Sequence, residues 1–274
     1  MTLSVIVCTH DRPDDLRRCL VGLQSLEDPV EVVVVDSASQ TPVDPVDGAR
    51  VVRLEEPGLS RARNAGLAVA SGDLVAFVDD DATVAPDWAR RISEPFADDD
   101  VGCVGGACVP AFASARPRWL SERLLQYAGI TRFHERREVA ARRDYPFGAN
   151  ICFRREAFGG GFPEHLGRTG SALLSGEEVV AIDRVLERGY RVVLEPGAVV
   201  HHLVAPERCR SSYFWRRLWW QGVTRARGEA SVGLTMRLLA ALPVRLALYA
   251  GTRDRMHLYR LAETAGYLRE LAAR

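Results

Sequence analysis

Short apolar segments alternate with helical patterns through the first hundred residues, and this alternation limits the folds that the chain can adopt. Four segments rich in valine and other apolar residues are predicted as buried strands: 3–10, 30–36, 49–55 and 73–79. Segments 12–26 and 58–71 carry apolar residues at helical spacing, and the second is expected to stop at Gly72. Buried strands separated by helices predict an α/β fold, with a Rossmann-like, mostly parallel sheet flanked by helices.

The middle of the chain has a weaker pattern. Residues 112–147 are rich in arginine and favour an insertion of loop and helix. A glycine-rich loop over 159–175 precedes a predicted helix that ends at Gly189. The segment 191–203 then reads as a strand, a turn and a second strand.

From residue 206 onward the pattern is helical and basic, with a break expected near Pro243. We therefore expect an α/β domain over 1–205, made of the halves 1–105 and 106–205. A helical C-terminal extension over 206–274 would follow it.

Charge and cysteine usage exclude several classes of protein. The 274 residues include 36 basic and 36 acidic ones, and this balance argues against a nucleic-acid partner. None of the six cysteines forms a CxxC or zinc-type pattern, which predicts free thiols in a reducing, cytoplasmic location. The first residues read as a strand rather than a signal peptide. Because no run of about 18 uncharged apolar residues occurs, no transmembrane helix is expected.

Three consecutive carboxylates, Asp79, Asp80 and Asp81, follow a predicted buried strand. Polar residues also follow the first two predicted strands, in "CTHDR" and "DSAS", and parallel sheets bind ligands at the carboxyl ends of their strands. A divalent cation such as Mg²⁺ or Mn²⁺ would offset the repulsion between the carboxylates, and it commonly binds substrate phosphates as well. The alternative is a solvated acidic turn at the start of a helix.

Four stretches together resemble the family-2 glycosyltransferases of the GT-A fold. They occur in the order found in that family and cover roughly residues 1 to 205: "VIVCTHDRPDDLRRCL", "EVVVVDSAS", "GLSRARNAGLAVASGDLVAFVDDDATVAPDW" and "GEEVVAIDRVLERGYRVVLEPGAVVHHLV". The resemblance implies an inverting transferase of the hexosyltransferase type that uses a nucleotide-diphosphate sugar as donor.

The resemblance also implies a donor site. The "CTHDR" loop, with Thr9, His10 and Arg12, would hold the nucleobase and ribose, and Asp36 would accept a hydrogen bond from the base. Arg63 would lie near the nucleotide. The three aspartates would form the family's Asp-any-Asp motif, in which Asp79 faces the ribose, Asp81 binds the metal and Asp80 assists one or the other. Asn150, in "GANICF", is expected to contact the sugar.

The acidic pair Glu177 and Glu178 matches the family's catalytic position, where Glu-Asp is more usual. We expect Glu178 to be the base, although the longer side chain leaves Glu177 as the alternative. A histidine near 201–202 would complete a metal site with Asp79 and Asp81. The spacing from Pro196 favours His202, and strand alternation places His201 on the other face.

The sequence is also compatible with two other functions, and it does not specify the acceptor. A nucleotidyltransferase would share the sheet and the metal, but "VCTHDRP" lacks the glycine-rich phosphate loop that such an enzyme needs. A non-catalytic sugar-nucleotide-binding protein is the second alternative. The acceptor would be lipid-linked, a glycan or a small molecule. The apolar tail, interrupted by Arg237 and Arg245, would contact the inner membrane face peripherally, form a homodimer or pack within the protein.

Overall fold

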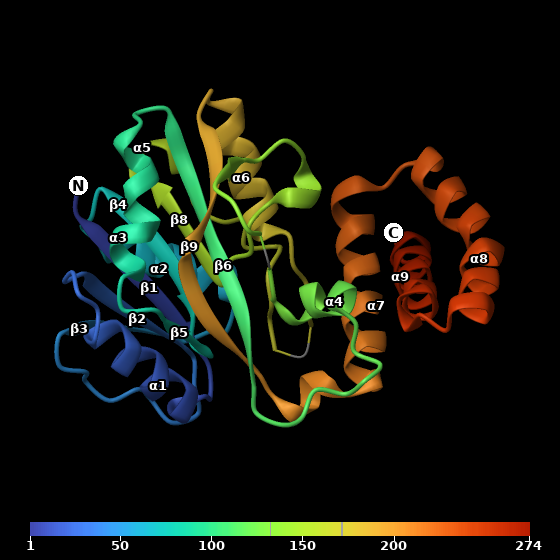
Figure 1. Cartoon of the computed structure of the whole chain (residues 1–274), viewed down its shortest axis with the longest axis horizontal. Helices are drawn as coiled ribbons and strands as arrows, with labels where there is room; N and C mark the ends of the chain where they lie inside the picture. Colours follow the sequence, from blue (N-terminus) through green and yellow to red (C-terminus); the bar gives the residue numbers. More distant parts are fainter. Residues whose placement is uncertain (132, 171) are drawn as a thin grey trace. The chain divides into compact units, whose positions relative to one another are not determined.

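The computed structural model describes residues 1–131, 133–170 and 172–274. Arg132, in the expected insertion, and Ser171, in the expected glycine-rich loop, lie outside the described residues. The chain divides into two compact units, and each is described by itself. The first contains Met1–Ala111, Gly129–Gly170 and Glu177–Leu203, and the second is formed mainly by Phe112–Ala128 and Val204–Arg274 (Figure 1).

The first unit contains the parallel half of a nine-stranded sheet. Adjacent strands pair in the order β3-β2-β1-β4, and all three pairings are parallel. Their bounds are β1 Leu3–Thr9, β2 Glu31–Ser37, β3 Ala49–Leu54 and β4 Leu74–Asp79, with α1 Pro13–Gln24, α2 Leu59–Val69 and α3 Trp88–Ser93 between or after them. All four predicted strands and both predicted helices are therefore present.

The other half of the sheet is mixed, and most of its pairings are antiparallel. It continues from β4 in the order β8-β6-β9-β5, while β7 pairs with β9. The bounds are β5 Ala82–Val84, β6 Val101–Phe112, β7 Arg137–Glu138, β8 Asn150–Arg154 and β9 Arg191–Val204, with α5 Arg155–Phe158 and α6 Glu177–Glu187. The prediction of a turn within 191–203 was wrong. Pro196 lies inside one continuous strand.

Apolar residues of alternating orientation bury both faces of the sheet. On one face, Val32 and Val34 pack with Leu16 of α1 and Trp88 of α3. On the other, Val33 and Val35 belong to a core cluster with Ala62 of α2 and Ile182 of α6. Because each strand is buried on both sides, it reads as a continuous apolar run, and this is what made the strands recognisable in the sequence.

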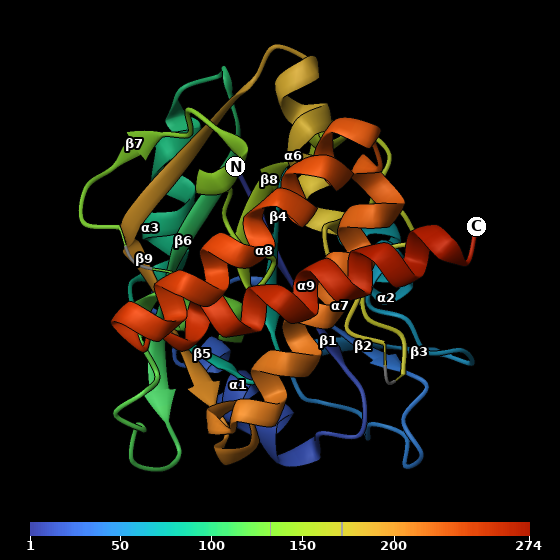
Figure 2. The same cartoon turned by 90° about the vertical axis from the view of Figure 1, so that its right-hand side faces the viewer.

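The second unit is mostly helical. It contains α4 Glu122–Leu125, α7 Ser211–Glu229, α8 Val232–Thr252 and α9 Arg255–Ala272, and α8 and α9 lie next to each other (Figure 2). Two glycines allow α7 and α9 to approach closely. A Cβ atom added at Gly222 would lie 1.9 Å from the carbonyl oxygen of Glu263, and one at Gly266 would lie 2.1 Å from that of Trp219.

Helix α8 differs from two expectations drawn from the sequence. It continues through Pro243 without a break. A proline removes one backbone donor and disfavours a helix interior, but the flanking turns here are held against α9. By length and composition, α8 is also apolar enough to cross a membrane, and only 6% of its most apolar window is buried. The expectation that no such segment exists was too strict, because it allowed no arginine in the window.

Candidate active site

The site lies where β4 ends and the chain turns into β5. Asp79 is the last residue of β4, and Asp80 and Asp81 form the connection to Ala82. Ala82 pairs with His202 of β9, and the backbone N–H of Leu203 donates to the carbonyl of Asp81 at 2.8 Å. This register brings His202, which lies 120 positions after Ala82 in the sequence, to the carboxylates.

Asp79, Asp81 and His202 form a compact group. Nε2 of His202 lies 3.2 Å from Oδ1 of Asp81 and 3.7 Å from Oδ2 of Asp79. One potential ligand atom from each of the three residues lies within 4.8 Å of the others. His202 is 2% exposed, whereas His201 is exposed, as expected from strand alternation. The structure thus brings together the three residues predicted to bind metal.

The donor set of this group fits a divalent cation. Two carboxylates supply hard oxygen ligands and the imidazole adds a nitrogen, a combination compatible with Mn²⁺ or Mg²⁺. Burial opposes ionisation of Asp79, yet the hydrogen bond with His202 and the charge of Arg63 hold the pKa of its carboxyl well below the ordinary value. A carboxylate that stays ionised in this partly buried position is suited to metal binding.

Asp80 has the opposite electrostatic character. Burial raises its pKa to about 6, although the neighbouring Arg12 opposes the rise. Nη1 of Arg12 lies 3.1 Å from Oδ1 of Asp80 and 3.3 Å from Oδ2 of Asp81. The hydroxyl of Thr9 donates to Oδ2 of Asp80 at 2.8 Å. Thr9 and Arg12 therefore contact the aspartates directly, and their predicted contacts with a nucleotide remain predictions.

Arg63 connects the aspartates to the acidic pair at the start of α6. It is 3% exposed, and its Nη1 lies 2.9 Å from Oε1 of Glu177, which is also buried. Its Nη2 donates to the carbonyl of Gly148 at 3.2 Å and lies 3.5 Å from Oδ1 of Asp79. Burial and the neighbouring Glu178 raise the pKa of Glu177, whereas Arg63 lowers it.

Glu178 has fewer contacts than Glu177. Its side chain is half-buried, and its Oε2 atom accepts no hydrogen bond from the described part of the chain. Glu177 is instead held by the guanidinium of Arg63. Oε2 of Glu177 is likewise buried and accepts no hydrogen bond from the described residues, so the two glutamates differ in the contact of Oε1 of Glu177 with Arg63.

A cavity of about 700 Å³ opens at the carboxyl ends of β1 and β2. Its lining includes Thr9, Arg12 and Ser39. Asp36, the last but one residue of β2, shapes the loop beside it. Its carboxylate accepts hydrogen bonds from the backbone N–H groups of Ser39 at 2.9 Å and Val43 at 3.1 Å.

Arg53 is a residue of this region that the sequence analysis missed. Its Nη1 donates to Oδ2 of Asp36 at 2.6 Å. The pairing of β2 with β3 places Arg53 directly opposite Asp36, so the parallel register was the signal that could have identified it. His10, by contrast, is an exposed residue whose Nδ1 lies 2.7 Å from the carbonyl oxygen of Ser37. Its predicted contact with the nucleotide also remains a prediction.

Asn150 is completely buried and all of its amide contacts are internal. Its Oδ1 accepts from Nε1 of Trp88 at 2.9 Å, and its Nδ2 donates to the carbonyls of Ala107 at 3.0 Å and Ala198 at 2.9 Å. The side chain thus connects α3 with β6 and β9. Its predicted contact with the sugar would require breaking these bonds, and that contact remains a prediction.

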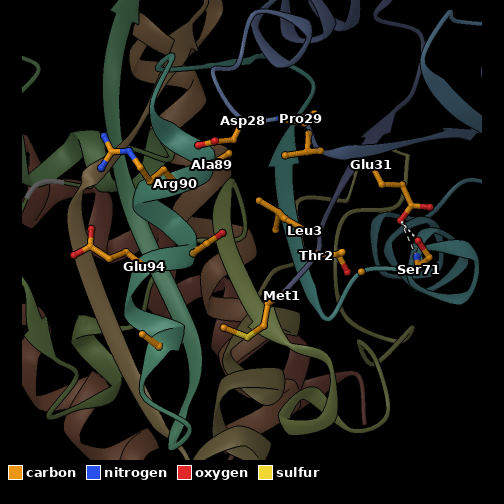
Figure 3. A pocket seen from close by; sticks show the side chains of 14 residues that line it. Met1, Thr2, Leu3, Asp28, Pro29, Glu31, Ser71, Ala89, Arg90 and Glu94 are labelled. Atoms are coloured by element: carbon orange, nitrogen blue, oxygen red, sulfur yellow. Dashed lines mark hydrogen bonds between the residues drawn. The ribbon is translucent and has the colours of Figure 1, made fainter.

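A second cavity, of about 760 Å³, lies at the opposite edge of the parallel strands. Residues near the amino ends of β1 and β2 line it, together with Ser71, Ala89 and Arg90 (Figure 3). Glu31 accepts a hydrogen bond there from the hydroxyl of Ser71 at 2.9 Å. Because ligands of parallel sheets bind at the carboxyl ends, we assign the site to the edge that carries the aspartates.

Comparison with known proteins identifies relatives of the chain. The model of the family described as Glycosyl transferase family 2 matches residues 4–162. A glucosyl-dolichyl phosphate glucuronosyltransferase of Haloferax volcanii is 29% identical over 242 residues, which cover 82% of this chain and 76% of that protein. The succinoglycan biosynthesis protein ExoM of Rhizobium meliloti is 27% identical over 82% of this chain and 74% of its own length.

Solved structures share the fold at low sequence identity. The mannosyltransferase PcManGT from Pyrobaculum calidifontis, in complex with GDP-Man and Mn²⁺, is 21% identical with a TM-score of 0.60, and the match covers 97% of this chain and 86% of that one. TarS of S. aureus in complex with UDP is 17% identical with a TM-score of 0.56, and the match covers 97% and 89% of the two chains.

Proposed function

Because the chain belongs to glycosyltransferase family 2, we propose that it transfers a sugar from a nucleotide-diphosphate sugar to an acceptor hydroxyl with inversion. The observation that carries this proposal is the linked set of charged groups in the first unit. Arg63 contacts the carboxylate of Asp79 with one nitrogen and that of Glu177 with the other. A metal-binding aspartate and the residue next to the candidate base Glu178 are thereby held in one arrangement.

The donor would bind at the carboxyl ends of β1, β2 and β4. The cavity beside Ser39 and Thr41 would take the nucleoside, with the loop around it held by Asp36. The diphosphate would then lie near Asp79 and Asp81. The structural neighbours that bind GDP-Man and UDP support a nucleotide-sugar donor of this kind.

Asp79, Asp81 and His202 would hold a divalent cation, for which we propose Mn²⁺ or Mg²⁺. When bound, the cation would neutralise part of the negative charge that develops on the leaving diphosphate. The Mn²⁺ in the PcManGT complex supports this proposal. Arg12, whose guanidinium already lies at Asp80 and Asp81, would add a second positive charge on the same side.

Glu178 would act as the catalytic base. As the acceptor oxygen attacks the anomeric carbon, Glu178 takes the hydroxyl proton. The bond between that carbon and the diphosphate oxygen breaks, and its electron pair leaves with the diphosphate. Glu177 is less suited to this role, because Arg63 already occupies one of its oxygens. We propose that Glu177 positions Arg63.

The acceptor and the location are further parts of the proposal. A phosphate-linked lipid is the first acceptor to test, because the relative from Haloferax volcanii is named for a dolichyl phosphate substrate. Glycans and small molecules are the other classes in such a screen. All six cysteines are free thiols, which supports a reducing, cytoplasmic compartment.

Thermal unfolding with nucleotides tests the donor site. We expect one of UDP, GDP, dTDP and CDP to raise the melting temperature in the presence of Mn²⁺ or Mg²⁺, because it binds the native state. The shift should disappear with a chelator. If no nucleotide shifted the transition under any condition, the donor site would be wrong. Binding without sugar transfer to any acceptor would instead favour a non-catalytic function, and release of free diphosphate from a nucleoside triphosphate would favour a nucleotidyltransferase.

A further inference from the structure

One face of helix α8 is apolar and exposed. Six large apolar side chains lie on it, with exposed fractions from 39% for Leu239 to 82% for Val232: Val232, Met236, Leu239, Val244, Leu246 and Leu248. Arg237 is the only charged residue among the exposed positions of α8. An ordinary surface helix has a polar outer face, so this contiguous apolar face indicates a contact with something other than water.

The opposite face of α8 is already occupied within the second unit. Leu238 is buried in a cluster with Ala226 of α7 and Tyr267 of α9. Nη1 of Arg245 donates to the carbonyl of Arg260 at 2.8 Å and to the hydroxyl of Thr264 at 2.7 Å. The charge of Arg245 therefore faces α9. It does not interrupt the exposed apolar face.

The charged residues within α8 have one sign. Helix α8 contains no carboxylate, and the exposed residues Arg237 and Arg253 lie about 24 Å apart along the helix at 1.5 Å per residue. The nearest acidic residues beyond its two ends already have partners: Oε2 of Glu229 lies 3.5 Å from Nε of Arg225, and Asp254 accepts from the backbone N–H of Met256 at 2.9 Å. In a chain with equal numbers of acidic and basic residues, this segment is distinctly cationic.

We propose that α8 binds the surface of an anionic membrane, with its exposed apolar face in the boundary between headgroups and acyl chains. Arginines at a helix border complement lipid phosphates, and large apolar side chains supply the insertion energy. A second copy of the chain fits this face less well, because it would bring further arginines towards Arg237 and Arg253 without a carboxylate on α8 to pair with them.

The packing of α8 favours binding along the surface over crossing the bilayer. Its partner α9 carries the ion pair between Arg260 and Glu263, and Glu270 of α9 pairs with Arg227 of α7. A crossing α8 would either lose α9 or take these charges into hydrocarbon, which is costly. The inference depends only on the second unit, so its failure would leave the proposed sugar transfer untouched.

Flotation of the full-length protein with vesicles tests this proposal. We expect binding to vesicles of phosphatidylcholine and phosphatidylglycerol, and weaker binding to phosphatidylcholine alone. High salt should reduce the difference, because it screens the arginines. Bound protein should be released by alkaline carbonate, as expected of a helix that does not span. Retention after that treatment would show that α8 crosses the membrane and would overturn the proposal.

Charge variants test whether vesicle binding depends on the apolar face of α8 or is unspecific adsorption. Combining Met236→Glu with Leu246→Glu should lower the vesicle partition coefficient at least about tenfold, since both exposed side chains would leave the acyl region. Ala265→Glu, at an exposed position of the neighbouring helix α9, adds a carboxylate in the same unit and serves as the control. It should bind as the unchanged protein does, and circular dichroism should show the same helix content for all three.

Three results would contradict the proposal. The first is that the unchanged protein binds neither kind of vesicle. The second is that Ala265→Glu loses as much binding as the double variant, which would mean that the apolar face is not the determinant. The third is that light scattering after gel filtration shows a dimer that the double variant dissociates, without any lipid binding, in which case a second copy covers α8.

Discussion

Nη1 of Arg63 lies 2.9 Å from Oε1 of Glu177, and both side chains are buried. The two residues are 114 positions apart in sequence. The same guanidinium lies 3.5 Å from Asp79, one of the three potential metal ligands. Through Arg63, the acidic pair at the start of α6 and the aspartates at the end of β4 share one buried positive charge.

Replacing Arg63 should destabilise the protein strongly. Arg63→Met would leave Glu177 buried without its partner, and the free energy of unfolding should fall by about 3–5 kcal/mol. The double variant Arg63→Met with Glu177→Met removes both charges and should recover part of that loss. Urea titration of the three proteins measures the effect. Equal stability of Arg63→Met and the unchanged protein would mean that the ion pair contributes nothing.

Glu178→Gln should remove the base while leaving the donor site intact. We expect turnover to fall by about 10²–10⁴-fold, which is the usual contribution of a general base. The dissociation constant of the nucleotide should stay within a few-fold of the original. Steady-state kinetics and calorimetric titration measure the two quantities. Normal turnover of Glu178→Gln, together with inactive Glu177→Gln, would transfer the role to Glu177.

The metal site predicts a contrast between two adjacent histidines. His202→Ala should weaken nucleotide binding in the presence of Mn²⁺, because Nε2 of His202 lies within 3.7 Å of both Asp79 and Asp81. His201→Ala is the matched control, since its side chain is exposed and lies on the other face of β9. Without metal, all proteins should bind nucleotide equally weakly. Calorimetric titration with and without chelator would disprove the site if His201→Ala had the larger effect.

The raised pKa of Asp80 predicts that the protein loses free energy of unfolding when this carboxyl ionises. Its folded pKa of about 6 exceeds the ordinary value of 3.8, so the stability that it contributes is complete below 3.8 and lost as the pH rises through 6. This difference corresponds to roughly 3 kcal/mol. Relative to the unchanged protein, Asp80→Asn should therefore become more stable between pH 4 and pH 7, measured by urea titration with chelator present.

Asp36→Asn serves as a control, because the pKa shift of Asp36, and therefore its change of stability with pH, has the opposite sign. Burial opposes its ionisation, but the hydrogen bonds from Ser39 and Val43 and the charge of Arg53 lower the pKa of its carboxyl. Its contribution to stability is present above 3.8 and is lost as the pH falls through the lower folded value. Asp36→Asn should accordingly become relatively less stable as the pH rises to about 3.8, and it should show no further relative change between pH 4 and pH 7. The same trend for both variants would contradict the assignment for Asp80.

Asn150→Ala distinguishes a structural amide from a sugar contact. The substitution would leave Nε1 of Trp88 and the carbonyls of Ala107 and Ala198 without their partner, at a cost of about 1–3 kcal/mol for each group left buried and unpaired. We expect a large loss of stability and an unchanged Michaelis constant for the donor at a temperature where the variant is folded. A raised Michaelis constant without loss of stability would support the predicted contact with the sugar.

The sequence was most informative about structural features that a single short segment determines by itself. Strands β1, β2 and β4 are apolar on both faces, and the aspartates lie at the end of β4, so both the sheet and its functional edge could be predicted. Contacts that depend on tertiary register could not. The pairing of Arg53 with Asp36 and of Ala82 with His202 exists only once the strands are aligned.

The internal hydrogen bonds of Asn150 and the continuous helix around Pro243 show a second limit of prediction from the sequence. A buried amide and a substrate-binding amide have the same sequence signature, and only the surrounding donors and acceptors tell them apart. Similarly, proline disfavours a helix locally, whereas the packing of α8 on α9 depends on residues more than ten positions away. The two-domain boundary at residue 205 and its internal division at 105 remain predictions. Residues Phe112–Ala128 belong to the same compact unit as Val204–Arg274.

The contact between α7 and α9 at Gly222 and Gly266 makes these two positions interdependent. Each glycine faces the backbone of the opposite helix, so there is no flexible side chain that could move aside for a methyl group. A single change to alanine at either position would force the helices apart along their whole length, and the second glycine would then face an empty gap. In evolutionary terms, neither position can drift alone, and the helix pair would have to be replaced as a unit or kept as it is.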